Sequence, residues 1–276
     1  MQTRYASSPN EVKHMTTEQL RANFLIEKLF VSGEINFVYS HYDRVITGGA
    51  MPTTEGLTLG TYNELKADYF LERREMGIIN VGGDGVVEAD GKKYKLRKLD
   101  CVYLGKGTKD VVFKSNDAEN PAQFYILSAP AHRDCTNKMM LKEDASPLTI
   151  GSPETANHRT IYKYIHVDGI RSCQLVMGLT TLHTGSVWNT MPSHVHDRRM
   201  EVYFYFDVPS DQAAVHFMGQ PQETRHIFMA NHQAVISPPW SIHSGCGTTN
   251  YGFIWGMAGE NFVYTDMDAV AINELR

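Results

Sequence analysis

The chain has 276 residues, of which 42% are hydrophobic and 21% are charged, and its formal net charge is −5. This length and composition are typical of a folded globular protein with one large core or two smaller ones. The negative charge, without a basic stretch, argues against nucleic acid or an anionic membrane as a partner.

No run of about 18 uncharged apolar residues is present, so we expect no membrane-spanning helix. The first five residues have no apolar core, so they do not resemble a secretory signal. The four cysteines are scattered and form neither a CxxC pair nor a dense framework. Together these features predict a cytoplasmic protein.

Two short helices are predicted, one near each end of the chain. Thr16 lies three residues before Gln19, which is the spacing of a capping box, and Leu20, Phe24 and Leu25 follow at helical intervals. This pattern predicts a helix over residues 16–28. We expect a second helix in the tail, over residues 266–275.

Between these helices the sequence predicts strands, because short runs of β-branched and aromatic residues alternate with Gly- and Pro-containing turns. In the first half the predicted strands are 35–46, 77–81, 85–95, 102–104, 111–113 and 123–127, with turns at 82–85 and 90–91. In the second half they are 173–179, 202–206, 213–218, 226–229, 234–236 and 251–257. Strands of this length and spacing favour a β-sandwich or barrel.

A weak internal repeat divides the chain into two halves. Residues 71–76 resemble residues 196–201, and an apolar strand follows each of these two segments. Further along each half, residues 100–104 resemble residues 233–237. The segment 147–157 is rich in Ser, Pro, Thr and Gly, as a linker would be. We therefore expect two related β-barrel domains, residues 1–150 and 151–276.

Residues 192–201 contain the pattern that most clearly indicates chemistry. His194 and His196 are two residues apart, so on a strand their imidazoles point to the same face. Glu201 can return on the next strand, and His243 follows a Pro-containing turn. Three nitrogens and one oxygen suit a catalytic zinc, or iron, manganese or nickel.

In the first half, the positions that the repeat aligns with these ligands cannot form a comparable histidine site. They are Tyr69, Leu71, Glu75 or Met76, and roughly Asp110. We therefore expect the N-terminal barrel to be structural or to form oligomer contacts, and the chemistry to belong to the C-terminal barrel.

The pattern His-x-His-x4-Glu with a distal histidine resembles the metal motif of the cupin superfamily. Longer stretches resemble the bacterial 5-keto-4-deoxyuronate isomerase family, and the resemblance runs from about Arg21 to the C-terminus. These stretches are 39–41, 69–75, 103–107, 188–192, 198–206, 218–226, 240–245 and 253–257.

This resemblance implies a mainly β bicupin, with two double-stranded β-helix (jelly-roll) barrels and a few short helices. It implies a homohexamer with one Zn²⁺ per subunit, held by His194, His196, Glu201 and His243. The implied reaction converts 5-keto-4-deoxyuronate (4-deoxy-L-threo-5-hexosulose uronate) to 3-deoxy-D-glycero-2,5-hexodiulosonate during pectin and uronate degradation.

The residues that would move the proton and bind the substrate are less clear from the sequence. Glu223 lies in a polar segment and Tyr205 shares strand parity with Glu201, so both are candidate bases. Arg199 and Arg225 are the candidates for binding the substrate carboxylate, because arginine binds carboxylates in bidentate fashion.

Three other functions remain open at this stage. An iron dioxygenase or a phosphosugar isomerase of the cupin superfamily could use the same four ligands, although no Gly-rich phosphate loop leads into a helix. A non-catalytic sugar-binding cupin would bind its ligand without turnover.

Overall fold

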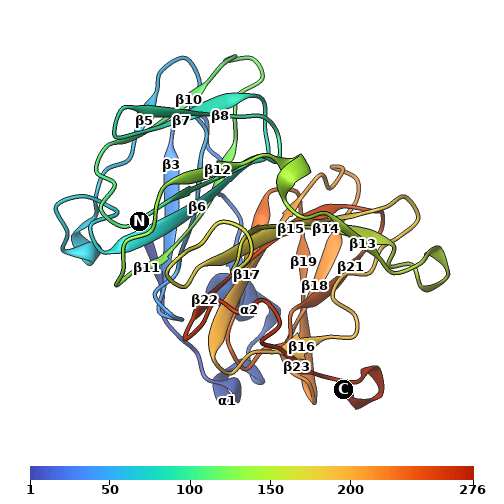
Figure 1. Cartoon of the computed structure of the whole chain (residues 1–276). Helices are drawn as coiled ribbons and strands as arrows, with labels where there is room; N and C mark the ends of the chain where they lie inside the picture. The colour runs from blue at the N-terminus through green and yellow to red at the C-terminus, as the bar shows by residue number, and fades with distance from the viewer.

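The computed structural model describes all 276 residues and consists mainly of β-sheet, arranged in two halves that lie side by side (Figure 1). The larger sheet of the first half has the order β1 (Gln2–Arg4), β3 (Ile35–Ser40), β4 (Ile46–Ala50), β11 (Phe124–Pro130), β6 (Arg74–Asn80), β9 (Cys101–Leu104) and β12 (Lys138–Met140). The smaller sheet has the order β5 (Leu57–Thr58), β10 (Val111–Ser115), β7 (Gly85–Ala89) and β8 (Lys92–Leu96).

The second half repeats this arrangement. Its larger sheet has the order β13 (Leu148–Ile150), β14 (Arg159–Ile165), β15 (Val176–Leu182), β22 (Gly252–Gly259), β17 (Arg199–Phe206), β20 (Gln233–Ser237) and β2 (Leu25–Ile26). Facing it are β19 (Glu223–Met229), β18 (Ala214–Gln220) and β21 (Ser244–Gly247), and a separate pair joins β16 (His194–Val195) to β23 (Asp268–Ala269). The order β4-β11-β6-β9 of the first half therefore corresponds to β15-β22-β17-β20 of the second.

One buried arginine occupies the same place in both halves. Arg74 begins β6 and pairs with the last residue of β11, just as Arg199 begins β17 and pairs with the last residue of β22. Both guanidinium groups are buried and donate to backbone carbonyl oxygens. The repeat seen in the sequence is thus a repeat of strand position and of side-chain role.

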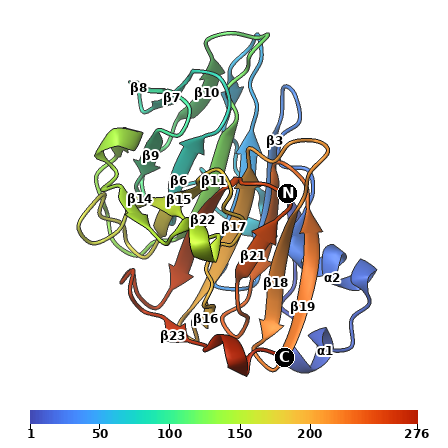
Figure 2. The same ribbon diagram turned by 90° about the vertical axis from the view of Figure 1, so that its right-hand side faces the viewer.

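The N-terminal segment crosses between the halves. Strand β1 pairs with β3 of the first half, whereas β2 pairs with β20 of the second. The helices α1 (Pro9–Val12) and α2 (Thr17–Phe24) lie beside β18 and β19 (Figure 2). The division near residue 150 remains a proposal, and residues 25–26 depart from it because they complete a sheet of the second half.

The predicted helix over residues 16–28 is confirmed at its start and wrong at its end. The Thr16 hydroxyl accepts a hydrogen bond from the Gln19 backbone, and the Gln19 side chain accepts one from the Thr16 backbone. Helix α2 ends at Phe24, because Leu25 and Ile26 adopt an extended backbone and pair with β20. Tertiary strand pairing outweighs helical propensity there.

The predicted tail helix is also wrong. Residues 268–269 form β23, and only a 3-10 turn over Ile272–Glu274 follows it. The remaining 3-10 turns are Asn63–Leu65, Lys142–Asp144 and Pro153–Thr155. No helix in the structure has the length and apolar character that crossing a bilayer requires.

Most predicted strands are present, with shifted ends. The stretch 35–46 is interrupted by a turn in which Asp43 and Arg44 have positive φ, so it forms β3 and the start of β4. The stretch 85–95 forms the hairpin β7–β8 around Asp90-Gly91, as the turn residues predicted. Strand β14 was not predicted, although its sequence alternates β-branched and aromatic residues.

A buried carboxylate joins the two halves. The Glu75 side chain is fully buried and accepts hydrogen bonds from the backbone N–H groups of Cys173, Gln174 and Leu175, at 2.6–2.8 Å. The Tyr103 hydroxyl donates a fourth bond at 2.6 Å. Glu75 thus satisfies three buried N–H groups in the other half of the chain, which have no other protein acceptor.

We predict that Glu75→Ala lowers the free energy of unfolding by about 3 kcal/mol or more, because each buried donor left without an acceptor costs about 1–3 kcal/mol. Urea unfolding followed by intrinsic fluorescence measures this loss. The control is Glu143→Ala, which removes an exposed ion pair with Arg97 and should cost less than about 1 kcal/mol. Equal losses for the two variants would contradict the role assigned to Glu75.

Candidate metal centre

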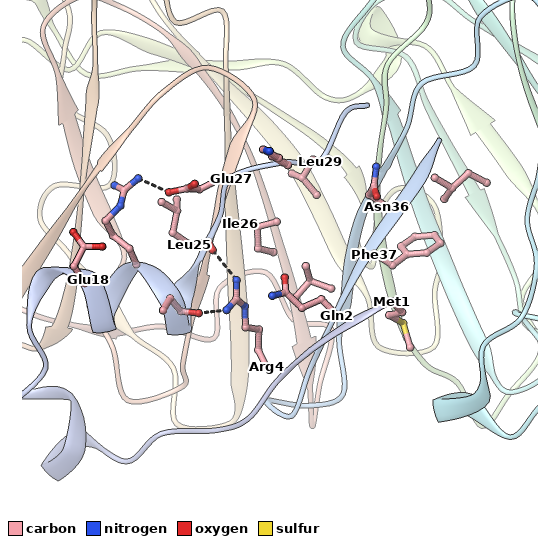
Figure 3. A pocket seen from close by; sticks show the side chains of 15 residues that line it. Met1, Gln2, Arg4, Glu18, Leu25, Ile26, Glu27, Leu29, Asn36 and Phe37 are labelled. Carbon is pink, nitrogen blue, oxygen red and sulfur yellow. Dashed lines mark hydrogen bonds and ion pairs between the residues drawn. The ribbon is translucent and has the colours of Figure 1, made fainter. Parts of the chain in front are cut away.

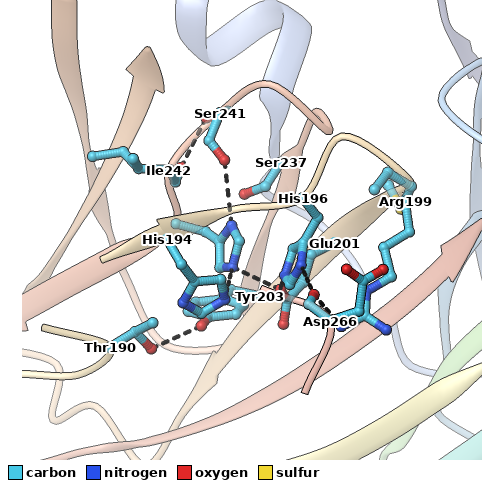
Figure 4. A network of polar contacts seen from close by, with 12 residues as sticks. Thr190, His194, His196, Arg199, Glu201, Tyr203, Ser237, Ser241, Ile242 and Asp266 are labelled. Atoms are coloured by element: carbon cyan, nitrogen blue, oxygen red, sulfur yellow. Dashed lines mark hydrogen bonds and ion pairs between the residues drawn. The ribbon is translucent and has the colours of Figure 1, made fainter. Parts of the chain in front are cut away.

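Four side chains from three separate segments converge at one end of the second barrel (Figure 4). His194 lies on β16, His196 follows that strand, Glu201 lies on β17, and His243 immediately precedes β21. Their candidate ligand atoms all lie within 4.8 Å of one another. The structure therefore brings together the four residues that the sequence predicted as ligands.

The distances inside this cluster are those of groups that share one centre. His243 Nε2 lies 2.9 Å from His194 Nε2 and 2.8 Å from Glu201 Oε2, and His196 Nε2 lies 3.1 Å from the same carboxylate oxygen. Tetrahedral ligands with bonds of about 2.0–2.1 Å lie about 3.3 Å apart, so small adjustments fit the cluster to a metal ion. The four residues could hold such an ion.

The protonation states also suit metal binding. Burial and the neighbouring His243 lower the pKa of His194 to about 2, so its imidazole is neutral. Burial alone would raise the pKa of Glu201, but His243 and His196 hold that pKa well below its usual range. A neutral imidazole and an ionised carboxylate are the forms in which these groups bind metals.

Backbone carbonyl oxygens orient two of the histidines. The His196 Nδ1–H donates to the Asp266 carbonyl oxygen at 2.6 Å, and the His243 Nδ1–H lies 3.4 Å from the Ser241 carbonyl oxygen. With the proton on Nδ1, the Nε2 lone pair of each ring is left free, and both Nε2 atoms face the Glu201 carboxylate in the cluster.

A cavity of about 240 Å³ adjoins the cluster. It is lined by Ile150, Arg159, Ile161, Thr180, Thr190, Pro192, His194, His196, Glu201, Tyr203, Phe253, Trp255, Met257, Tyr264 and Met267. Its volume is below the range of about 300–1,000 Å³ that is usual for drug-sized ligands, so it suits a small metabolite. About half of the lining residues are apolar, and the polar groups belong to the cluster, Arg159, two threonines and the two tyrosines.

The last part of the chain covers this cavity and is held there by two adjacent arginines. Arg199 is fully buried and donates to the carbonyl oxygens of Val263 at 2.6 Å and Asp266 at 2.9 Å. Arg198 forms ion pairs with Asp266 and Asp268. We call residues 261–269 the C-terminal strap, because they connect these arginines to the cavity wall at Tyr264 and Met267.

The substrate-binding role of Arg199 and Arg225 stays a prediction, and the contacts of both side chains do not favour it. The Arg199 guanidinium is occupied by the C-terminal strap and does not line the cavity. Arg225 donates to the carbonyl oxygens of Val12, Lys13 and Met15, and thereby holds the N-terminal segment. Neither arginine is available to a ligand in the cavity.

The two candidate bases, Glu223 and Tyr205, also stay predictions, and neither lines the cavity. Glu223 is exposed at the start of β19 and does not line the cavity. Tyr205 is fully buried, and its hydroxyl lies 2.9 Å from His216 Nδ1, so it packs beyond the cavity wall. Tyr205 does share strand parity with Glu201. However, Tyr203 lies between them on β17 and is the tyrosine of this strand that reaches the cavity.

Sequence reasoning missed several cavity residues. Tyr203 shares the parity of Glu201, and its hydroxyl lies 2.8 Å from Thr190 Oγ1, so the same argument could have identified it. Arg159 was missed because β14 was not predicted. Trp255 also lines the cavity.

A second cavity, of about 510 Å³, lies between α2 and β3 (Figure 3). Its lining includes no histidine or cysteine. Three of its charged groups are engaged within the protein, because Arg21 pairs with Glu27 and Arg4 donates to the carbonyl oxygens of Ala22 and Leu25. It offers no set of metal ligands.

The first barrel contains no equivalent of the metal cluster. Leu71 and Met76, which correspond to His196 and Glu201, are fully buried in its apolar core. Glu75 is directed to the contact between the halves. Among all the described residues, one group has the composition and spacing of a metal site.

Comparisons with known proteins agree with this arrangement. A model of the KduI/IolB family matches residues 24–272. The 4-deoxy-L-threo-5-hexosulose-uronate ketol-isomerase of Formosa agariphila is 60% identical over 275 residues, which cover 100% of this chain and 98% of that protein. The protein of the same name from Halalkalibacterium halodurans is 56% identical over 276 residues, which cover 100% of both chains.

Two solved structures share the fold at low sequence identity. An IolB-like protein from Salmonella typhimurium LT2 has a TM-score of 0.73 at 16% identity, covering 90% of this chain and 97% of that one. The oxalate decarboxylase of Lactobacillus farciminis has a TM-score of 0.61 at 10% identity, covering 91% and 89%. The predicted fold class, a mainly β protein of two cupin-type jelly-roll barrels, is confirmed.

We predict that the purified protein retains about one divalent ion per chain and that His243→Ala loses most of it, because a fourth ligand and its fixed geometry are removed. Elemental analysis after dialysis measures the bound metal. His14→Ala, which removes an exposed imidazole far from the cluster in sequence, should retain it. Equal metal contents for His243→Ala and the wild type would refute the ligand assignment.

We also predict that Arg199→Met lowers the free energy of unfolding by about 3 kcal/mol, since the carbonyl oxygens of the C-terminal strap lose a buried, charged donor. Metal affinity should fall about 10- to 100-fold, because the Asp266 carbonyl oxygen that orients His196 is no longer held. Urea unfolding and competition with a chelator measure these effects. The matched variant is Arg198→Met, which loses only partly exposed ion pairs and should cost less than about 1 kcal/mol.

Proposed function

The chain belongs to the KduI/IolB family, and from this premise we propose that it is a 4-deoxy-L-threo-5-hexosulose-uronate ketol-isomerase of uronate degradation. The observation that supports this most strongly is identity of 60% to a protein of that name along the whole chain. The four-residue cluster beside a small, partly apolar cavity is the kind of site that the reaction needs.

A ketol isomerisation moves a hydrogen between two adjacent carbons of the sugar. The C1 carbonyl becomes a hydroxyl, the C2 hydroxyl becomes a carbonyl, and no electrons leave the substrate. The C–H bond at C2 is weakly acidic, so the rate depends on stabilising the negative charge that develops on the two oxygens.

A bound divalent ion would supply a Lewis acid for those oxygens, which is worth several kcal/mol of transition-state stabilisation. His194, His196, Glu201 and His243 would hold it. We propose zinc, one ion per chain, because zinc is redox-inert and suits an isomerisation.

The other residues of the cavity position the substrate, donate hydrogen bonds to it and exclude water from it. The hydroxyls of Tyr203 and Tyr264 stay protonated at neutral pH, since tyrosine has a pKa near 10, and can donate to a substrate oxygen. Phe253, Trp255 and Met257 exclude water from the substrate, which strengthens these polar contacts. Glu201 is the only carboxylate in the lining.

The finer features implied by the family resemblance are part of the same proposal. We propose that the product is 3-deoxy-D-glycero-2,5-hexodiulosonate, that the pathway is pectin degradation, that the enzyme works in the cytoplasm, and that it assembles as a homohexamer. Several apolar side chains are exposed, including Leu148, Phe228 and Ile272, and could lie in subunit contacts.

We predict that the metal-loaded protein converts 5-keto-4-deoxyuronate to its 2-ketose isomer, as followed by NMR. Dialysis against a chelator should abolish turnover and zinc should restore it. His243→Ala should lower kcat/KM about 1,000-fold or more, because several kcal/mol of transition-state stabilisation is lost, whereas His14→Ala should leave it unchanged.

Three outcomes would contradict the proposed function. Bound iron with oxygen uptake and no isomerisation would indicate a dioxygenase. Turnover of phosphosugars alone would indicate a phosphosugar isomerase. Stabilisation by the uronate without any product would indicate a binding protein.

A further inference from the structure

The cavity beside the metal cluster contains one cationic side chain, that of Arg159. Arg159 begins β14, where it pairs with Leu182 of β15 and with Ile150 of β13. Ile161, two residues further along β14, pairs with Thr180, and both of these side chains also line the cavity. Strand alternation therefore places Arg159 on the cavity face of the sheet.

Most of the hydrogen-bonding capacity of Arg159 is unused. Its one bond within the protein joins Nη1 to the Asn157 carbonyl oxygen at 2.9 Å. Arg159 takes part in no ion pair, and its Nε and Nη2 atoms are not sealed from solvent. A guanidinium has five N–H donors, so a planar acceptor in the cavity could be bound by two of them at once.

This distinguishes Arg159 from the other arginines near the site. Arg199 and Arg225 are occupied by backbone carbonyl oxygens, and Arg198 is paired with two aspartates. A partly buried cation without a counter-charge is costly to maintain. Burial lowers the pKa of Arg159, as expected for a cation in such a place, but an arginine remains charged at neutral pH.

The proposed substrate has a carboxylate, so it needs a cationic side chain at a distance from the metal ligands. The reacting atoms C1 and C2 are at one end of the six-carbon chain, and the C6 carboxylate is at the other. Carbon 4 of the substrate is a methylene, which needs no hydrogen-bond partner. Apolar side chains such as Ile161 and Phe253 line the same cavity as the metal cluster and Arg159.

We propose that Arg159 binds the C6 carboxylate of the uronate in bidentate fashion and is the residue that selects an acidic sugar over a neutral one. This inference rests on the proposed function, which supplies the identity of the substrate. It assigns to Arg159 the role that the sequence had suggested for Arg199 and Arg225.

The test compares two substrates in three variants of the metal-loaded enzyme. The substrates are 5-keto-4-deoxyuronate and its neutral analogue, which has a hydroxymethyl group in place of the carboxylate. The variants are Arg159→Met, Arg159→Lys and the control Lys163→Met. Lys163 lies on the same strand and does not line the cavity. Its Nζ atom lies 5.4 Å from the centre of the Tyr264 ring.

For Arg159→Met we expect kcat/KM for the uronate to fall about 100- to 1,000-fold, mainly through KM, while kcat/KM for the neutral analogue changes less than about threefold. Arg159→Lys should recover part of the loss, because it keeps the charge without the planar fork. Lys163→Met should stay within about threefold of the wild type for both substrates. Thermal unfolding midpoints close to that of the wild type establish that the variants fold.

Two results of this experiment would overturn the inference. The first is an equal loss for both substrates in Arg159→Met, which would indicate a structural role. The second is an unchanged kcat/KM for the uronate.

If the wild type turns over neither substrate, the proposed function fails. A binding measurement then tests the carboxylate site independently of the reaction. Calorimetric titration with D-galacturonate and D-galactose then measures the preference for a carboxylate directly. Tighter binding of galacturonate by the wild type than by Arg159→Met would support the carboxylate site, and equal binding would overturn it.

Discussion

The buried guanidinium of Arg199 is the contact on which the arrangement of the metal centre depends. Arg199 is the first residue of β17, two residues before Glu201. Its guanidinium donates hydrogen bonds to carbonyl oxygens of the C-terminal strap. The strap in turn supplies the Asp266 carbonyl oxygen that orients His196, together with Tyr264 and Met267 in the cavity wall. Because a buried cation is costly unless it finds hydrogen-bond acceptors, the two Nη atoms of this one strand residue hold the strap in its path.

The two barrels show how one scaffold can have different interiors. Arg74 and Arg199 occupy equivalent positions and both bind backbone carbonyl oxygens, so this element of the repeat is structural. The positions that carry His196 and Glu201 in the second barrel carry Leu71 and Met76 in the first, where they are packed in an apolar core. The first barrel instead uses Glu75 to bind three backbone N–H groups of the second. The barrel that contains the four-residue cluster is therefore supported by a neighbour that has no such cluster.

The cavity contains two kinds of binding group within a small volume. One region offers nitrogen and oxygen ligands for a metal, and Arg159 offers N–H donors for an anion, with apolar side chains lining the same space. This arrangement suits a small acidic sugar whose reacting carbons and carboxylate are at opposite ends. Of the two arginines inside the metal motif, Arg199 binds backbone carbonyl oxygens and Arg198 pairs with two aspartates, whereas Arg159, 35 residues before His194, faces the cavity.

The sequence by itself determined the features that depend on short-range geometry. The capping box at Thr16 and Gln19, the hairpin turn at Asp90-Gly91 and the shared face of His194 and His196 follow from local spacing, and the β-rich class follows from alternation. The pattern of residues 192–201 and the Pro-containing turn before His243 also indicated Glu201 and His243 as ligands, and resemblance along the chain added zinc and the expected reaction. Only the tertiary structure decided where α2 ends, how the tail runs and which arginine faces the cavity. The reason is physical, since Leu25 pairs with a strand more than 200 residues away, Arg199 binds carbonyl groups more than 60 residues away, and the direction of Arg159 is set by its pairing with β15.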